Sequence, residues 1–402
     1  MIVMKIRRTI VICILCSFYF SKIFGCIYNV RDVGFADLES NPYRLYYFIR
    51  EGTPEKLVST FRQISYATFM DSNVEVEIIN VDKQKEHPAM EYFHFWEIQS
   101  FPAAILVSPK GPSLVLPILV PNKPFKETVW SSLESVVFSP KREEILEHII
   151  KAYCVVILIE GEDAAENKRV HEAVDAATKK IDRIMNQLPK HIDEPPYIIV
   201  IPRELVSQEK ILLWSLDMNE NEVNEPCVAV LYGRGRRIGP LLEGEQITES
   251  GLFNILSVIS LSCDCVLDER WTMGTLLPLR WGRKIQSDVV KFLGFDAESP
   301  MVKMEMSSIM SINRSIRMED NGNIGSSWKE LNEYIEDVLA YESGSAVSRI
   351  SPAQLRELSS TRLSTPKSGL NLKMTLTIVG IIVLLIFAGS LFILLRSGRR
   401  IS

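Results

Sequence analysis

The sequence is poor in cysteine and histidine, the side chains most often used for thiol chemistry and for metal binding. Its 402 residues include seven cysteines and five histidines. The histidines are scattered, so the His-x-x-x-His pair of zinc hydrolases is absent, and neither a G-x-S-x-G nucleophile motif nor a Walker phosphate loop occurs. We therefore predict no catalytic residue, no cofactor and no firm metal ligand.

The chain also lacks an excess of basic residues. Lysine and arginine together number 45, against 50 for aspartate and glutamate, and the formal net charge is −5. Proteins that bind nucleic acid generally present a strongly basic surface. The charge gives no electrostatic basis for nucleic-acid binding, and we predict none.

A long apolar run does stand close to the end of the sequence. Residues 374–395 carry no charge, and three arginines follow within residues 396–402. A helix rises about 1.5 Å per residue and the apolar core of a bilayer is about 30 Å thick, so about 20 such residues cross it. Basic flanks stay on the cytoplasmic side. We predict a transmembrane helix over 374–395 and a cytoplasmic tail over 396–402, with a buried core helix as the alternative.

The first residues have the pattern of a secretory signal peptide. Basic residues precede an apolar stretch over 9–20, and the small residue Gly25 follows. The stretch is short for a membrane span, so we expect residues 1–25 to be cleaved. The segment that ends in Cys26 also resembles a bacterial lipobox, and lipidation of Cys26 is therefore the alternative to ordinary cleavage.

Together the two ends predict a single-pass, type I membrane protein whose bulk is extracytoplasmic, in the periplasm, the extracellular space or a lumen. The polar residues 307–373 would form a stalk between the folded part and the span. Cleavage of the signal would leave few cysteines for so large a domain, which does not indicate a disulfide scaffold. Those left are Cys26, Cys154, Cys227, Cys263 and Cys265.

Residues 37–140 alternate between strand and helix patterns. Strands are predicted from runs of branched and aromatic residues over 43–49, 74–81, 103–108 and 114–119. Helices are predicted after Thr53, over 89–96 and over 126–137. Thr53 would cap the first helix, with Pro54 as its first residue. In the last helix, apolar side chains share one face: Val129, Trp130, Leu133 and Val136. Strands separated by helices predict an α/β sheet covered on both faces.

This order of elements resembles the thioredoxin-like superfamily. The third strand follows Phe101-Pro102, and in that family the proline at this position is in the cis form and faces the active site. Asp82 resembles the family's aspartate at a strand end, and Lys110-Gly111 resembles its hairpin turn. The family's Cys-x-x-Cys would stand after the first strand, where this chain has residues 52–55, Gly-Thr-Pro-Glu. The first domain is therefore expected to be non-redox.

A looser copy of the pattern follows over residues 141–262. Its predicted strands are 154–160, 197–201, 227–232 and 238–242, and its predicted helices are 163–188, 208–216 and 248–260. Pro226 stands where Pro102 stands in the first copy, and no cysteine pair follows the first strand. The chain thus resembles tandem domains without the Cys-x-x-Cys motif, similar to the non-catalytic, polypeptide-binding domains of protein disulfide isomerases.

A C-terminal extension over 263–306 begins with the closest thiol pair of the sequence, Cys263 and Cys265. Two sulfurs in this spacing could pair structurally with Cys154 or Cys227, exchange with disulfides, or bind a soft metal such as Cu(I). A further helix is predicted over 284–292. These readings stay open at the level of the sequence.

The loop 233–237, Gly-Arg-Gly-Arg-Arg, is a second candidate site. Free backbone donors and the guanidinium groups of Arg234, Arg236 and Arg237 could bind an anion, such as a phospholipid headgroup or an acidic partner. The loop joins two predicted strands, whereas phosphate loops lead into helices. A solvated hairpin turn is therefore the preferred interpretation.

The sequence as a whole predicts a membrane-anchored binding or adaptor protein. Surfaces near Pro102 and Pro226, with Arg234, Arg236 and Arg237 as further candidates, would bind a polypeptide or a partner in a membrane complex. The alternative is an exported thiol-disulfide oxidoreductase or a metal-handling protein that uses Cys263 and Cys265. The leading prediction is that the chain is not an enzyme.

Overall fold

The computed structural model describes residues 28–38, 41–187, 190, 192–218, 223–260 and 274–317, without the side chains of 309–317. All of them belong to one compact unit, Met1–Ile335. The predicted signal peptide, most of the predicted stalk, Cys26, the Cys263 and Cys265 pair and the run 374–395 lie outside the described residues. Among the helices in the described ranges, none combines the length and hydropathy needed to cross a membrane.

The first domain is built on a four-stranded mixed sheet in the order β2-β1-β3-β4. Its strands are β1 (Tyr43–Ile49), β2 (Val74–Asn80), β3 (Ala103–Val107) and β4 (Ser113–Leu116). β1 runs parallel to β2 and antiparallel to β3, and β4 is antiparallel to β3. One crossover connection followed by hairpin pairing produces this mixture of directions.

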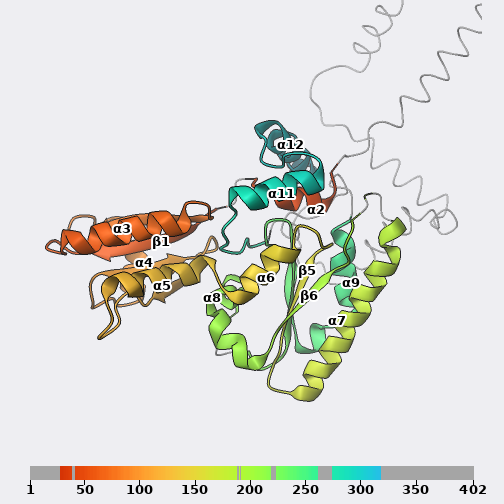
Figure 1. Cartoon of the computed structure of the whole chain (residues 1–402), viewed down its shortest axis with the longest axis horizontal. Helices are drawn as coiled ribbons and strands as arrows, with labels where there is room; N and C mark the ends of the chain where they lie inside the picture. Colours follow the sequence, from red (N-terminus) through yellow and green to blue (C-terminus); the bar gives the residue numbers. More distant parts are fainter. Residues whose placement is uncertain are drawn as a thin grey trace, which may run out of the picture. The chain divides into compact units, whose positions relative to one another are not determined.

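Helices cover both faces of the first sheet, as predicted. The helices are α3 (Glu55–Phe69), α4 (Met90–Phe95) and α5 (Phe125–Val137). Because side chains alternate along β1, Tyr43, Leu45 and Tyr47 face α3 and α5, whereas Tyr46 and Phe48 face α4. Figure 1 shows α3 and α5 with β1.

The second domain repeats the arrangement in the order β6-β5-β7-β8, with β5 parallel to β6 and antiparallel to β7. Its strands are β5 (Val155–Ile159), β6 (Tyr197–Ile201), β7 (Cys227–Tyr232) and β8 (Arg236–Glu243). Two mixed four-stranded sheets covered by helices confirm the tandem thioredoxin-like architecture.

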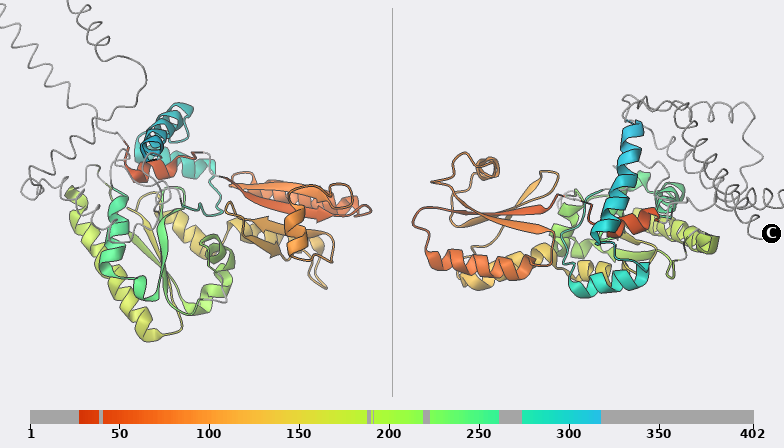
Figure 2. Two further views of the ribbon diagram at one scale, coloured as in Figure 1. Left: turned by 180° about the vertical axis from the view of Figure 1, so that it is seen from behind. Right: turned by 90° about the horizontal axis from the view of Figure 1, so that it is seen from above.

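The second sheet also lies between two helical layers. α7 (Ala164–Ile184) and α9 (Glu249–Val258) lie side by side on one face, as Figures 1 and 2 show. The other face packs against α6 (Pro140–His148) and α8 (Lys210–Ser215), the latter preceded by a 3₁₀ turn, Arg203–Glu209. Thr248 caps α9 by accepting a hydrogen bond from the Gly251 N–H.

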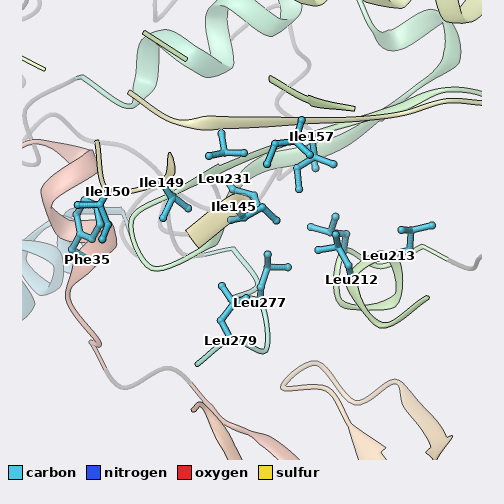
Figure 3. Close-up of a cluster of buried hydrophobic side chains, with 14 of the residues drawn as sticks. Phe35, Ile145, Ile149, Ile150, Ile157, Leu212, Leu213, Leu231, Leu277 and Leu279 are labelled. Carbon is cyan, nitrogen blue, oxygen red and sulfur yellow. The ribbon is translucent and has the colours of Figure 1, made fainter. Parts of the chain in front are cut away.

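The core of the second domain recruits residues from far outside 141–262. The short helix α2 (Val30–Phe35), α11 (Arg283–Leu293) and α12 (Pro300–Arg317) all contribute buried side chains. Figure 3 draws this cluster, in which Phe35 of α2 and Leu277 and Leu279 join the residues of α6, β5 and α8. α12 also extends over the first residues of the predicted stalk, 307–373, because Met306 is buried in the same core.

Two local predictions about the first domain were wrong. Thr53 does not cap α3, whose N-cap is Pro54, because the Thr53 hydroxyl accepts a hydrogen bond from the Arg50 N–H at 3.0 Å instead. Trp130 does not share the buried face of α5 but is 49% exposed, and Val137 is buried in its place.

A segment that we call the strap, residues 274–281, forms hydrogen bonds with both domains. From the first domain, the Tyr43 hydroxyl donates to the Leu276 carbonyl at 2.9 Å, and Asn73 bonds the backbone of Leu277 and Leu279. From the second domain, the Gly235 carbonyl accepts from the Leu277 N–H at 3.0 Å. Arg280 adds a bidentate ion pair with Glu134 of α5.

A buried arginine of α6 also connects the two domains. Arg142 is 2% exposed and donates hydrogen bonds to carbonyls at the end of α5, to the Ser139 hydroxyl and to the Pro278 carbonyl of the strap. The α5 acceptors are the carbonyls of Ser135, Val136 and Phe138. Burial lowers the pKa of Arg142 to about 10, against the opposing charge of Glu209.

Candidate functional site

Pro102, the residue directly before β3, is the position that the family resemblance marks as facing the active site. Phe101–Pro102 is a cis peptide, and Pro102 is buried directly at the start of β3. The form implied by the resemblance is therefore confirmed. The structure places Pro102 at the same end of the sheet as the end of β1, because β1 and β3 are antiparallel and Phe48 pairs with Ala103.

The end of β1 holds no thiol. Residues 52–55 occupy the turn into α3, where the redox members carry their cysteines, and none of these four side chains is a nucleophile that attacks disulfides. A hydrogen bond joins the end of β1 to the segment after β2, because the Glu51 N–H donates to the Asp82 carboxylate at 2.8 Å. Glu51 also lies 3.5 Å from Lys83. In the second domain, Asp163 caps α7 at the equivalent place.

Aromatic and cationic groups surround Pro102 instead. The Arg50 guanidinium lies 4.4 Å from the centre of the Phe101 ring, and the Phe93 ring of α4 lies 5.8 Å from the same ring. Within the described part of the chain, the N–H groups of Ser100 and Phe101 donate no hydrogen bond. We call this surface, formed by Arg50, Phe93, Ser100, Phe101 and Pro102, the Pro102 edge.

A second pair of exposed aromatic rings lies at the end of α4. Phe95 is 74% exposed and Trp96 is 38% exposed, and their rings meet edge to face at 5.4 Å. The Trp96 indole N–H donates to the Ser113 hydroxyl of β4 at 2.9 Å, which fixes its orientation. Large exposed rings on a folded domain are typical of surfaces that bind a partner.

The equivalent place in the second domain is closed. The Pro226 carbonyl accepts from the Gly244 N–H at 3.0 Å, and the Asn224 carbonyl accepts from the Glu162 N–H at 2.9 Å. A Cβ at Gly161 would lie 2.7 Å from the Pro226 nitrogen, so the neighbouring turn packs directly against this backbone. Pro226 is buried, and its peptide bond is not among the cis bonds of the described residues. The same position in sequence therefore presents two different surfaces.

The three arginines of the loop 233–237 each contact other residues of the chain. Arg234 forms an ion pair with Glu298 at 2.6 Å, and Arg237 lies 3.1 Å from Asp217. Arg236 is buried, which lowers the pKa of its guanidinium, and it donates to the Gly274 carbonyl. These contacts indicate a structural role, and anion binding by the loop stays a prediction.

The cysteines of the described residues, Cys154 and Cys227, are free and buried. Burial raises the pKa of both thiols, that of Cys227 to about 12, with Glu243 and Glu225 acting in the same direction. The attacking form in disulfide exchange is the thiolate, which these surroundings disfavour. Within the described ranges, no group of histidine, cysteine and acidic side chains could hold a metal ion.

Native Cys154 and Cys227 should react with an alkylating reagent at neutral pH about three orders of magnitude more slowly than in urea, because the raised pKa depletes the thiolate. Mass spectrometry of peptides from the labelled chain measures both rates. The folded state holds these protons more tightly than the unfolded chain does. Their contribution to the free energy of unfolding is therefore complete below about pH 8.5 and is lost as the pH rises towards about 12. Equal labelling rates in buffer and urea would contradict this prediction.

The sequence identified Pro102 but not Arg50 or Phe101. Arg50 follows β1 directly and Phe101 precedes β3, so both stand at positions that the family resemblance already marked as the site end of the sheet. The signal that could have found them is this placement, together with the aromatic character of residues 89–96, which the sequence did show.

No protein-family model and no curated protein matches the sequence. Solved structures do match. The zinc-bound form of human ERp44 has a TM-score of 0.20 and 10% identity over 56% of each chain. The first two thioredoxin domains of Saccharomyces cerevisiae Eps1p have a TM-score of 0.20 and 10% identity, over 54% of this chain and 92% of that one.

Full-length ERdj5 matches with a TM-score of 0.18 and 7% identity, over 54% of this chain and 29% of its own. The match covers about half the length of ERp44. These neighbours are thioredoxin-like proteins, but the similarity is too low for their activities to be transferred. The thioredoxin-like assignment rests on the order and directions of the strands in the two sheets.

Proposed function

We propose that this chain, with two thioredoxin-like domains in tandem and no Cys-x-x-Cys motif, is a membrane-anchored extracytoplasmic adaptor that binds an extended segment of a partner polypeptide. The observation that carries the proposal is the Pro102 edge, which leaves backbone N–H groups and aromatic faces unoccupied in a domain without a thiol. The binding site is assigned to the first domain, because the turn at Gly161 packs directly against the backbone of Glu225 and Pro226 in the second domain, and the carbonyls of Asn224 and Pro226 are bonded internally.

An extended peptide suits the Pro102 edge for two physical reasons. Its carbonyls can accept hydrogen bonds from the Ser100 and Phe101 N–H groups, in the manner of a strand added at a sheet edge. Its apolar side chains can cover the rings of Phe93, Phe101 and Phe95, and aromatic contacts of this kind usually supply most of the binding energy. Neither contribution depends on a reactive group in the protein.

A purely binding role also agrees with the thiols of the described residues. Both are buried with raised pKa, and the turn into α3 carries none. The alternative, thiol exchange or metal handling by Cys263 and Cys265, involves residues outside the described part of the chain, and nothing in the described part favours it. We therefore propose that the chain is not an enzyme.

The membrane anchor belongs to the proposal and rests on the sequence. The uncharged run 374–395 with its basic flank, and the signal pattern over 1–25, supply the span and its direction. In this topology the Pro102 edge faces the extracytoplasmic space.

Binding of a neutral probe tests the site and the topology together. The full-length chain is prepared in sealed vesicles whose cytoplasmic face points outward, and a fluorescein-labelled Gly-Ser peptide with a central Phe-Asn-Leu-Asn segment is added. We expect binding only after the membrane is permeabilised. Phe101→Ala should weaken it roughly 30-fold, as expected for an aromatic hot spot worth about 2 kcal/mol.

Tyr66→Ala provides the matched control, because Tyr66 is an aromatic residue of the same domain that is 71% exposed on α3, across the sheet from α4. The Tyr66→Ala variant should bind the labelled peptide with the same affinity as the unaltered protein. A thermal melt shows whether each variant is folded, and Phe95→Ala is a second variant at an exposed position. If neither Phe101→Ala nor Phe95→Ala reduces affinity, or if intact vesicles bind the peptide fully, the proposal is wrong.

A further inference from the structure

The charged side chain of Arg50 has no polar partner among the described residues. Its residue is exposed, and its backbone N–H, not its side chain, bonds Thr53. Within the described ranges the guanidinium forms no hydrogen bond and no ion pair, and its recorded contact is with the face of the Phe101 ring at 4.4 Å. A stacked guanidinium contacts the ring through its own face, so its in-plane N–H donors stay available.

The acidic side chains of Glu51 and Asp82 at this end of the sheet have partners other than Arg50. Lys83 lies 3.5 Å from Glu51, and the Asp82 carboxylate accepts the Glu51 N–H. Arg50 therefore has a positive charge that forms no ion pair with a carboxylate of the described residues. Because the guanidinium lies over Phe101, this charge lies beside the N–H groups that would bind the backbone of an extended segment.

The planar fork of an arginine matches a carboxylate in a bidentate pair, and such charge-assisted hydrogen bonds are about twice as strong as neutral ones. We infer that the Pro102 edge selects extended polypeptide segments in which an aspartate or glutamate stands next to apolar or aromatic side chains, with the carboxylate bound by Arg50. This inference rests on the proposed function and defines the chemistry of its partner.

The same features could serve a different occupant, a lipid surface with anionic headgroups, since Phe95 and Trp96 of the same domain are also exposed. The unbonded N–H groups of Ser100 and Phe101 favour the peptide, because they require carbonyl acceptors at a fixed spacing, which a fluid headgroup layer does not provide. A peptide with a carboxylate is therefore the occupant to which the inference commits.

The experiment compares two probes on the full-length protein in permeabilised vesicles of neutral lipid. One labelled Gly-Ser peptide contains Phe-Asp-Leu-Asp and the other contains Phe-Asn-Leu-Asn, so they differ in charge but hardly in shape. The unaltered protein should bind the acidic peptide about tenfold more tightly, as expected for one charge-assisted bidentate contact. High salt should reduce this preference.

Arg50→Gln should abolish the preference, so that the variant binds the two peptides with equal affinity. Arg50→Lys should restore only part of it, because lysine keeps the charge but loses the planar fork. Arg62→Gln is the matched control, since Arg62 is also an exposed arginine of the first domain but lies on α3. This control should retain the full preference.

The possible failures are distinguishable. Equal affinities of the two peptides for the unaltered protein would overturn the inference about charge and leave the proposed function standing. Binding of neither peptide would overturn both. If vesicles of anionic lipid bind the protein in an Arg50-dependent manner and the peptides show no charge preference, the edge binds headgroups and the inference is wrong.

Discussion

Replacement of Arg142 by methionine is expected to lower the free energy of unfolding by about 3–5 kcal/mol, the usual cost of removing one partner from a buried charged network. The variant leaves the last carbonyls of α5 without their buried donor, including those of Val136 and Phe138. It also leaves Glu209, which is 3% exposed, without its nearby cation. Methionine fills a similar volume, so the loss reflects polar groups that are left unpaired and not a cavity.

Urea unfolding followed by circular dichroism measures this effect. Arg142 holds α5 of the first domain and the strap to α6 of the second, so its loss should also separate one cooperative transition into two. Lys141→Met is the control, because Lys141 is the adjacent residue and forms an ion pair with Glu144 that is partly exposed. Such a pair contributes about 0–1 kcal/mol. Equal losses for the two variants would contradict the role assigned to Arg142.

Replacement of Gly233 by alanine is expected to cost about 3 kcal/mol, from a left-handed backbone and a direct overlap together. Gly233 has φ of +58°, and a Cβ there would overlap the backbone of Gly34 in α2. The two segments are also joined by the hydrogen bond from the Arg234 N–H to the Gly34 carbonyl at 3.0 Å. The methyl group can be accommodated only if α2 moves away from the end of β7.

Gly294→Ala separates the two causes, because Gly294 has φ of +78° but no atom within 4 Å of the added Cβ. We expect it to cost about 1 kcal/mol, from the backbone alone. Urea unfolding of both variants gives the comparison, and hydrogen exchange of α2 should rise only in Gly233→Ala. If the two substitutions cost the same, the close approach of α2 is not what requires glycine.

The sheets could be predicted well because their strands are short, uninterrupted runs of branched and aromatic residues. The predicted strands 43–49, 197–201 and 227–232 have the same bounds as β1, β6 and β7. Burial on both faces makes such runs apolar throughout, and turn residues mark their ends. The order of strands and helices then fixed the family resemblance, and the two mixed sheets agree with it.

Of the helices that complete the second core, α11 (Arg283–Leu293) agrees with the predicted helix 284–292, but α2 and α12 could not be predicted in the same way. α2 has only six residues, and its capping box of Asn29 and Asp32 is a weak signal close to the predicted signal peptide. The part of α12 from residue 307 on was assigned to a polar stalk because the sequence there is rich in serine, asparagine, arginine and glycine, and the buried Met306 just before it does not stand out. Both helices are stabilised by residues distant in sequence, which local patterns do not report.

In the candidate site, too, features with a local sequence signal could be predicted, whereas contacts between distant residues could not. Pro102 could be located from the chain because its signal is local, but the stacking of Arg50 on Phe101 joins residues that only the pairing of β1 with β3 brings together. The equivalence of Pro102 and Pro226 was visible in sequence, whereas the closure of the second edge depends on hydrogen bonds from Glu162 and Gly244. The position of a residue within a repeated pattern therefore predicts the path of the backbone there, but not whether the polar groups of that backbone are free to bind a partner.

The strap has a consequence for the order of events during synthesis. The ribosome adds the strap after both sheets. The strap nevertheless supplies hydrogen-bond acceptors to Tyr43 and Asn73, and its side chains pack in the same hydrophobic core as those of α2. A growing chain emerges from its amino end, and domains fold as they appear. The first helix must therefore wait for a segment made some 240 residues later (from Phe35 to Thr275) before it finds its full packing, so the two domains are joined by the strap only after both sheets have been made.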